Sequence, residues 1–184
     1  MGCRIRVEPQ LLIVIAVSFL LLSVKWVFAW LMAMLLHEVC HIVALRLFHY
    51  KIHDISLGAF GAKIYCEPVH TIHAIICSAA GPIGSLMLIS LSHYFPILAL
   101  CGAVQGIYNL IPVYPLDGGR ILRSLLLGIP DSLATGIETA IHFLVFAALM
   151  TACIVLHKYT YRMIPILILL GIFLVVRKIS LQKS

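Results

Sequence analysis

The chain has 184 residues, of which 62% are hydrophobic and only 11% are charged. This composition excludes an ordinary soluble domain, in which about a quarter of the residues carry charge, and predicts a polytopic membrane protein with a single domain over residues 1–184. The net charge of +6 does not indicate nucleic-acid binding, because the positive side chains stand at the ends of apolar runs. Such positions are typical of residues that set membrane topology.

The first apolar region, residues 11–48, is too long for one membrane span. As a single helix it would measure about 57 Å, against a hydrocarbon core of about 30 Å. Its one polar cluster is Ser23 to Lys25, so we expect a turn there between two spans, Val7 to Val24 and Trp26 to Phe48. A single tilted helix is the alternative.

The second predicted span carries two imidazoles and a carboxylate, which is unusual at membrane depth and indicates a functional site. His37, Glu38 and His41 spell H-E-x-x-H, and on a helix the two histidines share one face and can converge on one ion. A catalytic zinc ion typically has three protein ligands and an open fourth position, and Glu38 would be the general base beside it. The alternative is a pair of structural core histidines. Cys40 projects to another side and is expected to be an apolar filler.

A β-hairpin is predicted directly after this helix. Two partly alternating runs, Ile52 to Leu57 and Ala62 to Glu67, are separated by a stretch with Gly58 and Gly61. Its exposed edge either holds an extended substrate by strand addition or belongs to an ordinary surface hairpin.

The third predicted span, Thr71 to His93, has Pro82 near its middle. The proline bends the helix, and small residues around it permit close packing against the second span. His70 and His73 share a helical face at its entrance. Because no carboxylate joins them, we do not expect them to bind a metal.

The fourth apolar segment, Pro96 to Ile111, is interrupted by Pro112 and Pro115 and resumes at Asp117. Irregular backbone at membrane depth survives only when it is buried in protein or lines a cavity, so the break indicates a site. Asp117 is the candidate third zinc ligand, with an N-cap as its alternative role. Asn109 either contacts the substrate or satisfies carbonyl groups freed by the prolines.

Two more spans, Leu133 to Leu156 and Tyr161 to Val176, complete the predicted fold. Glu138 and His142 form a local polar pair in the first of them. The fold class is therefore an all-α polytopic membrane protein of about six transmembrane helices, with a short β-hairpin after the second helix and a broken fourth helix.

The distribution of positive charge predicts the orientation. With six spans, ten positive residues share the side of both termini and three lie opposite: Arg4, Arg6, Arg46, Lys51, Lys63, Arg120, Arg123, Arg177, Lys178 and Lys183 against Lys25, Lys158 and Arg162. Positive residues concentrate in cytosolic loops, so both termini are expected in the cytosol. His37, His41 and Asp117 then fall in the same, cytosolic half of the bilayer.

Three motifs together resemble the site-2 protease family of intramembrane zinc metalloproteases: HEVCH at 37–41, AAGP at 79–82 and NLIPVYPLDGGR at 109–120. More narrowly, RIRVEP at 4–9 and LGAFGAKI at 57–64 resemble the sporulation branch of that family, the stage IV, FB type. The resemblance extends over residues 4 to about 128.

The resemblance implies that His37, His41 and Asp117 bind Zn²⁺, that Glu38 is the general base and that Asn109 belongs to the catalytic site. It also implies cleavage of a membrane-associated regulatory protein; in the sporulation branch this is a pro-sigma factor, pro-sigma-K. The expected partners are that substrate, the lipid bilayer and inhibitory membrane proteins, without nucleic acid. The expected location is a bacterial cell membrane, for the sporulation branch the mother-cell membrane around the forespore. We expect no C-terminal CBS domain.

Two alternatives remain open from the sequence. The same protease could act on an anti-sigma factor or a remnant signal peptide. In a different class, intramembrane histidine and aspartate residues also mark ion paths, so the chain could be a metal-ion transporter. Transporters often contain repeated halves, and this sequence shows no such repeat.

Overall fold

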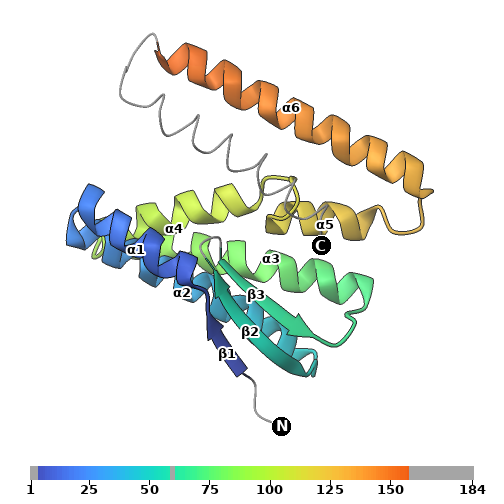
Figure 1. Ribbon diagram of the computed structural model, residues 1–184, viewed down its shortest axis with the longest axis horizontal. Coiled ribbons are helices and arrows are strands. Elements are labelled where there is room, and N and C mark those ends of the chain that lie inside the picture. The colour runs from blue at the N-terminus through green and yellow to red at the C-terminus, as the bar shows by residue number, and fades with distance from the viewer. Residues whose placement is uncertain (1–3, 59–60, 158–184) are drawn as a thin grey trace.

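The computed structural model describes residues 4–58 and 61–157 (Figure 1). Its elements in chain order are β1 (Arg4–Val7), α1 (Pro9–Leu21), α2 (Val24–Leu47), β2 (Ile52–Gly58), β3 (Gly61–Cys66), α3 (Thr71–Met87), the 3₁₀ helix η1 (Leu88–Leu91), α4 (Pro96–Asn109), α5 (Asp117–Leu125) and α6 (Asp131–His157). The expected fold class is confirmed: the protein is mostly helical, with a small sheet. The predicted sixth span, Tyr161 to Val176, lies outside the described residues.

The turn predicted between the first two spans is confirmed. The backbone is extended at Leu22 (φ −123°, ψ 153°) and at Ser23 (φ −68°, ψ 150°), and α2 begins at the next residue. A single helix over residues 11–48 is thereby excluded. The predicted start of the first span at Val7 is wrong, because Val7 pairs with Leu57 in a strand and the helix begins only at Pro9.

Three helices in the described part of the chain are long and apolar enough to cross a membrane: Val24–Leu47, Thr71–Leu91 and Asp131–Ala152. The apolar helix α1 has 13 residues and α4 has 14, so each measures about 20 Å and is shorter than the hydrocarbon core. The count of six spans therefore stays a prediction.

The sheet has three strands in the order β1, β2, β3. β2 and β3 form the predicted hairpin, antiparallel and in continuous register from Asp54↔Tyr65 to Gly58↔Gly61, with a register shift between Asp54 and the Ile52↔Cys66 pair. β1, which the sequence did not reveal, pairs in parallel with β2. Glu8 extends this connection, because its backbone nitrogen donates to the Leu57 carbonyl (2.9 Å) and its carboxylate accepts from Ser56 Oγ (2.8 Å). The sheet thus anchors the start of α1.

α2 packs against both α3 and α4, and α3 also contacts α4 and α5. One cluster of buried residues joins α2 to η1 and α4, and a second joins α2 to α3 and the hairpin; their buried members are Ala29, Ala33, Leu88 and Cys101, and Ala44, Leu45 and Cys77. The sheet lies on one side of α3 and α5 on the other (Figure 1). This arrangement packs one face of the H-E-x-x-H helix against α3, α4 and the hairpin.

The predicted break in the fourth segment is confirmed. α4 ends at Asn109, and residues 110–116 form an irregular loop before α5 starts at Asp117. The later part of the loop is buried in protein, since Val113 and Leu116 are each only 4% exposed, whereas Leu110 is 43% exposed. The glycines that follow make this possible, because a Cβ on Gly118 would overlap the Leu110 carbonyl oxygen. The chain therefore folds back tightly on itself just before Asp117.

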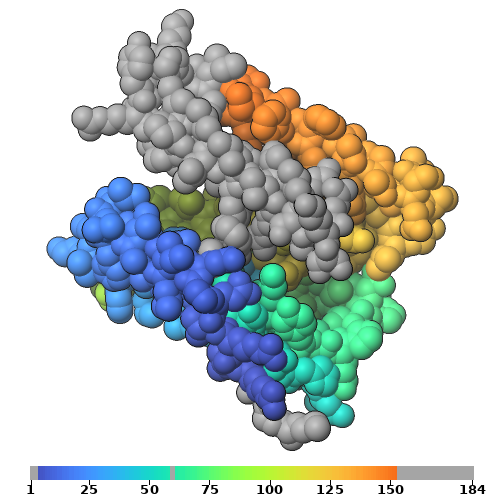
Figure 2. Space-filling model, in the orientation of Figure 1, coloured from blue at the N-terminus to red at the C-terminus, as the bar shows by residue number. Residues whose placement is uncertain are grey.

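α6 lies at one end of the molecule and the sheet at the other (Figure 2). In α6, none of the most apolar stretch of 18 residues is buried in the protein, as is expected of a helix surrounded by lipid. The predicted pair of Glu138 and His142 is present in a different form, because His142 Nδ1 donates to the backbone carbonyl of Glu138 (2.6 Å) and not to its carboxylate.

Candidate metal centre and active site

Three side chains from two distant segments converge on one point inside the protein. His37 Nε2 and His41 Nε2, on α2, lie 3.0 and 3.2 Å from Asp117 Oδ2, and the two nitrogens are 3.1 Å apart. All three residues are buried, with 3%, 7% and 5% of their surfaces exposed. Asp117 is the first residue of α5, and the N-cap position belongs to Leu116, so the alternative role of Asp117 as the N-cap is wrong.

The other nitrogen of each imidazole has its own partner. His41 Nδ1 donates to the backbone carbonyl oxygen of Cys77 (2.7 Å), and His37 Nδ1 shares a hydrogen bond with Ser85 Oγ (2.9 Å). Because a carbonyl oxygen can only accept, the proton of a neutral His41 ring is on Nδ1 and the lone pair of Nε2 points at the cluster. Both partners come from α3, which therefore orients the two rings.

The spacing of these atoms fits a zinc ion. Ligands about 2.0 to 2.2 Å from a tetrahedral zinc lie about 3.3 Å from one another, close to the three separations in this cluster. Two imidazoles and a carboxylate are also a donor set that zinc prefers in catalytic sites. Of the described residues, these three are the group of histidine, cysteine and acidic side chains that could hold a metal ion.

Gly81 explains how α3 comes close enough to hold the rings. A Cβ built at this position would overlap His41 Nε2 and would lie 2.8 Å from His37 Nε2. Any other residue would therefore displace α3 from the histidines. The close approach that the small residues predicted is confirmed, and its purpose is to bring Cys77 and Ser85 within hydrogen-bonding distance.

Glu38 lies beside the cluster and outside it. Its Oε1 accepts a hydrogen bond from the backbone nitrogen of Ala62 (2.8 Å), at the start of β3. The side chain is half-buried and lines the same cavity as His37 and His41. It is thus placed as a general base requires, near the metal ligands and accessible from a cavity.

Asn109 stands at the end of α4, facing the same space. Its Nδ2 donates to the backbone carbonyl of Gln105 (3.1 Å), one turn earlier in its own helix. Among the described residues it makes no hydrogen bond to the carbonyl groups of the proline loop, so that one of its two expected roles has no support.

The remaining oxygen of Asp117 faces a cation. Arg120 Nη1 is 3.8 Å from Asp117 Oδ1, on the next turn of α5, while Oδ2 faces the histidines. Because the Arg120 side chain is 44% exposed, this ion pair contributes little to stability. The position of Arg120 lets its guanidinium group orient the Asp117 carboxylate, and Arg120 also lines the cavity that His37, Glu38 and His41 line.

Other candidate ligands lie elsewhere. Cys40 packs against Gly84 of α3, as expected of an apolar filler. His73 stacks on Phe48 with ring centroids 4.1 Å apart, and its Nδ1 is hydrogen-bonded to Tyr50 Oη (2.9 Å). These contacts fasten the end of α2 to the start of α3.

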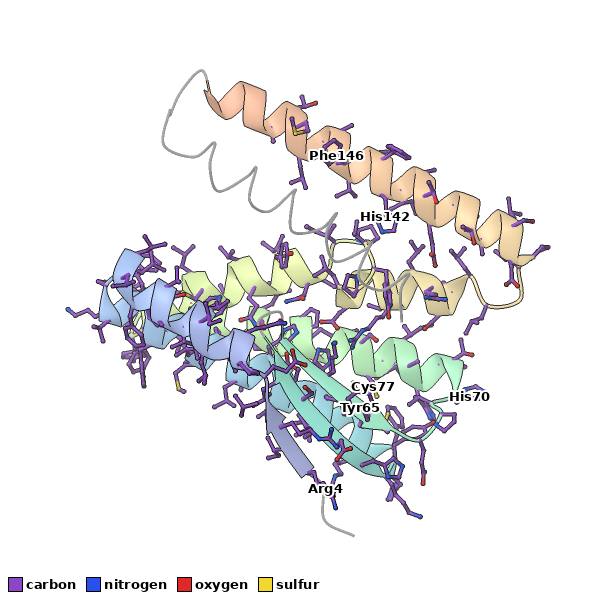
Figure 3. The ribbon with its side chains drawn as sticks, viewed as in Figure 1. Arg4, Tyr65, His70, Cys77, His142 and Phe146 are labelled. Carbon is purple, nitrogen blue, oxygen red and sulfur yellow. The ribbon has the colours of Figure 1, made fainter. Side chains whose placement is uncertain are left out.

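Two cavities meet at the cluster. The first, of about 170 Å³, lies between α2, α3 and the hairpin, and we call it the polar cavity because polar groups that include Arg120 and Ser78 line it. The second, of about 420 Å³, lies between α2 and α4. His37, Glu38 and Asn109 line both. Cys77 is on the face of α3 toward the hairpin that carries Tyr65 (Figure 3).

Sequence reasoning missed several groups of this site. Ser85 is one of the small residues around Pro82 for which only close packing was expected, and neither the Cys77 carbonyl nor the Ala62 backbone nitrogen has a sequence signal. Gln105 and Arg120 also lie at the cavities without having been singled out. The DGGR sequence was the one available signal, since it places Arg120 on the same face of α5 as Asp117.

Comparison with known proteins agrees with this geometry. The sequence model of the family described as Peptidase family M50 matches residues 66–153, a region that includes Asn109 and Asp117. The solved structure of a site-2 protease from Methanocaldococcus jannaschii is similar with a TM-score of 0.64 and 26% identity, over 95% of this chain and 88% of that one. The structural match thus extends over both halves of the cluster. This chain is thus similar to peptidase family M50 in sequence over residues 66–153 and to a site-2 protease in structure.

Two curated proteins are also similar to this chain in sequence. A zinc metalloprotease of Methanocaldococcus jannaschii is 29% identical over 133 residues, which are 63% of this chain and 39% of that protein. Stage IV sporulation protein FB of Bacillus subtilis is 29% identical over 135 residues, 65% of this chain and 46% of the relative. The matched region therefore spans less than half the length of either relative.

Proposed function

We propose that this protein is an intramembrane zinc endopeptidase of peptidase family M50, the site-2 proteases, that hydrolyses a peptide bond in a membrane-associated regulatory protein. The observation that carries the proposal is the convergence of His37, His41 and Asp117 within 3.0 to 3.2 Å of one another, with Glu38 beside them. Three ligands and an adjacent carboxylate are the residues that zinc-assisted peptide hydrolysis requires.

The residues of the chain have separate tasks in this reaction. Zinc, when bound by His37, His41 and Asp117, would lower the pKa of a coordinated water and polarise the scissile carbonyl. Glu38 accepts the proton of the attacking water as the new C–O bond forms, and it delivers that proton to the amine nitrogen as the C–N bond breaks. Asn109 lines both cavities, where its amide can hold the peptide on either side of the cleaved bond.

The hairpin supplies the surface for an extended substrate. Peptide bonds in a helix are protected, so the substrate segment must unwind before it is cleaved. β3 is an edge strand of the sheet, and Gly61, Ala62, Ile64 and Cys66 of this strand line the polar cavity beside the cluster. Strand addition to this edge would place an unwound peptide next to Glu38. This supports a substrate-binding role for the hairpin.

The substrate that we propose is a pro-sigma factor, released from a membrane during sporulation under the control of inhibitory membrane proteins. Its support is the similarity to stage IV sporulation protein FB together with the N-terminal RIRVEP sequence, which forms β1 and the start of α1. An anti-sigma factor and a remnant signal peptide are the alternative substrates. The orientation that we propose, with both termini in the cytosol, follows the bias of positive charge and would place the cluster toward the cytosol.

Reconstitution with each candidate substrate tests the proposal. The purified, zinc-loaded protein and its Glu38→Gln variant are placed in lipid vesicles with a pro-sigma factor, an anti-sigma factor or a signal peptide. We expect cleavage of the pro-sigma factor by the wild type alone. Cleavage of another substrate instead would support the peptidase activity and replace the pro-sigma factor as the substrate. Absence of zinc-dependent cleavage of all three would contradict the proposal.

A further inference from the structure

The larger cavity is an apolar channel between α2 and α4, with a volume of about 420 Å³. Each helix contributes a stripe of side chains spaced one turn apart, Trp26, Trp30 and Met34 from α2 and Leu100, Val104 and Tyr108 from α4. We call this cavity the α2/α4 channel. Its volume lies in the range of sites that bind ligands.

The α2/α4 channel leads to the reacting groups. His37, Glu38 and Asn109 form its inner end and are shared with the polar cavity. From Glu38 to Trp26 the helix rises about 18 Å, the length of about five residues of extended peptide. On the α4 side, Leu100 and Val104 are 51% and 60% exposed, which lets an occupant enter from the lipid.

A single polar atom distinguishes a peptide from a lipid chain as the occupant. Gln105 lines the channel, and its Oε1 is buried without a hydrogen-bond partner in the part of the chain that the structure describes. Buried acceptors are nearly always paired, so this oxygen requires a donor from outside. The backbone N–H of an extended peptide is such a donor, whereas an acyl chain has none.

We propose that the α2/α4 channel binds the apolar stretch of the substrate on one side of the scissile bond. The stretch is extended, its bulky side chains pack against the two tryptophans, and one of its backbone N–H groups donates to Gln105 Oε1. This inference rests on the proteolytic function proposed above. Because the polar cavity with Arg120 takes the other side, the cleaved bond lies where an apolar stretch of the substrate meets a polar one.

Occupancy can be measured without catalysis. Trp26 and Trp30 are the two tryptophans of the whole chain, and both line the channel, so tryptophan fluorescence reports on it directly. The probe is a synthetic, tryptophan-free peptide in which a leucine-rich stretch adjoins a stretch of lysine and glutamate. It carries the quencher nitrotyrosine in one stretch or the other. In lipid nanodiscs with the Glu38→Gln variant, we expect saturable quenching only when nitrotyrosine is in the apolar stretch.

Two substitutions on one helix separate the channel from nonspecific partition into lipid. Val104→Phe narrows the channel, whereas Ile107→Phe is the matched control, because Ile107 is 63% exposed and lines neither cavity. In the Glu38→Gln background, we expect Val104→Phe to lower the affinity for the peptide at least tenfold and Ile107→Phe to leave this affinity unchanged. In the active enzyme, Val104→Phe should change the preferred substrate residue next to the scissile bond from leucine to alanine.

N-methylation of the peptide tests the role of Gln105. The backbone nitrogens of the apolar stretch are methylated one at a time. For the protein that retains Gln105, we expect methylation at one peptide position to weaken binding about tenfold. In the Gln105→Leu variant that position should become insensitive to methylation. A merely structural role for Gln105 would leave the methylation profile unchanged, and that result would overturn the assigned hydrogen bond.

The channel and the enzyme can fail separately. Suppose that the wild type cleaves and Glu38→Gln does not, but the peptide quenches the tryptophan fluorescence of Val104→Phe and Ile107→Phe with the same affinity. The channel proposal is then overturned, and the proteolytic function is retained. If Val104→Phe abolishes saturable quenching but the zinc-loaded wild type cleaves no peptide, peptide binding is supported and the proteolytic function is overturned.

Discussion

Glu38 Oε1 accepts a hydrogen bond from the backbone nitrogen of Ala62, at 2.8 Å, and this contact joins α2 to the edge strand β3. The preceding residue, Gly61, has a φ of 105°, and a Cβ there would lie 2.9 Å from the same oxygen. Glu38, the proposed base, is therefore positioned by the hairpin and not by the proposed metal ligands. In this account the strand that would bind the substrate also positions the group that activates the water.

Replacing Gly61 with alanine should reduce cleavage without removing zinc. The added methyl group would press on Glu38 Oε1, and the positive φ would be strained by about 1 to 2 kcal/mol. Gly128→Ala is the matched control, because Gly128 has a φ of 99° and open space around it. We expect a fall in kcat at full zinc content for Gly61→Ala only. Equal kcat values in the two variants would show that the hairpin does not position the base.

The Glu38→Gln variant should bind zinc and fail to cleave. The amide oxygen can still accept the Ala62 N–H, so the local structure is retained, but the amide cannot accept a proton from water. Loss of a general base lowers the rate by about 10² to 10⁴-fold. Zinc content by mass spectrometry and the single-turnover cleavage rate are the two measurements. A variant that cleaves at the wild-type rate would remove Glu38 from the mechanism.

Ser85→Ala should weaken zinc binding without abolishing it. His37 Nδ1 would lose its partner at 2.9 Å, and partners of this kind contribute about 10 to 100-fold to metal affinity. Ser90→Ala is the control, since Ser90 is exposed and its hydroxyl donates to the Met87 carbonyl. Affinity is measured by titration against a chelator. An unchanged zinc affinity in Ser85→Ala would mean that the serine does not orient the ring.

Cys66 should react slowly with maleimide near neutral pH. Burial raises the pKa of its thiol above the usual range, with Glu67 adding to the shift, so the reactive thiolate is scarce until the pH passes that raised pKa. The alkylation rate in a variant with this single cysteine should therefore keep increasing above the pH at which free cysteine reaches its plateau. A plateau at the pH of free cysteine would show that the thiol is solvated and not packed beside the polar cavity.

The sequence predicted the parts of this structure that depend on local pattern. The pairing of His37 with His41 follows from a four-residue spacing, and the turn at Ser23 follows from the length of an apolar run. Asp117, eighty positions from His37, was predicted because the proline break at membrane depth is itself a local signal. These features required no knowledge of which helices touch.

What the sequence could not show depends on long-range packing. β1 is four residues long, and it is a strand only because β2 lies beside it, so no periodic pattern reveals it. The roles of Ser85 and of the Cys77 carbonyl arise because Gly81 lets α3 approach α2. Asn109 lines both cavities, but its bond to the Gln105 carbonyl lies within its own helix, and no sequence pattern indicates it.

The central claim is that Asp117 completes a catalytic zinc site, and measuring zinc content together with peptide cleavage in Asp117→Ala tests it most directly. Asp131→Ala is the matched control, because Asp131 also begins a helix but lies on the exposed surface. We predict one zinc ion per chain and cleavage for the wild type and Asp131→Ala, and loss of both for Asp117→Ala. Full zinc content and normal cleavage in Asp117→Ala would contradict the account.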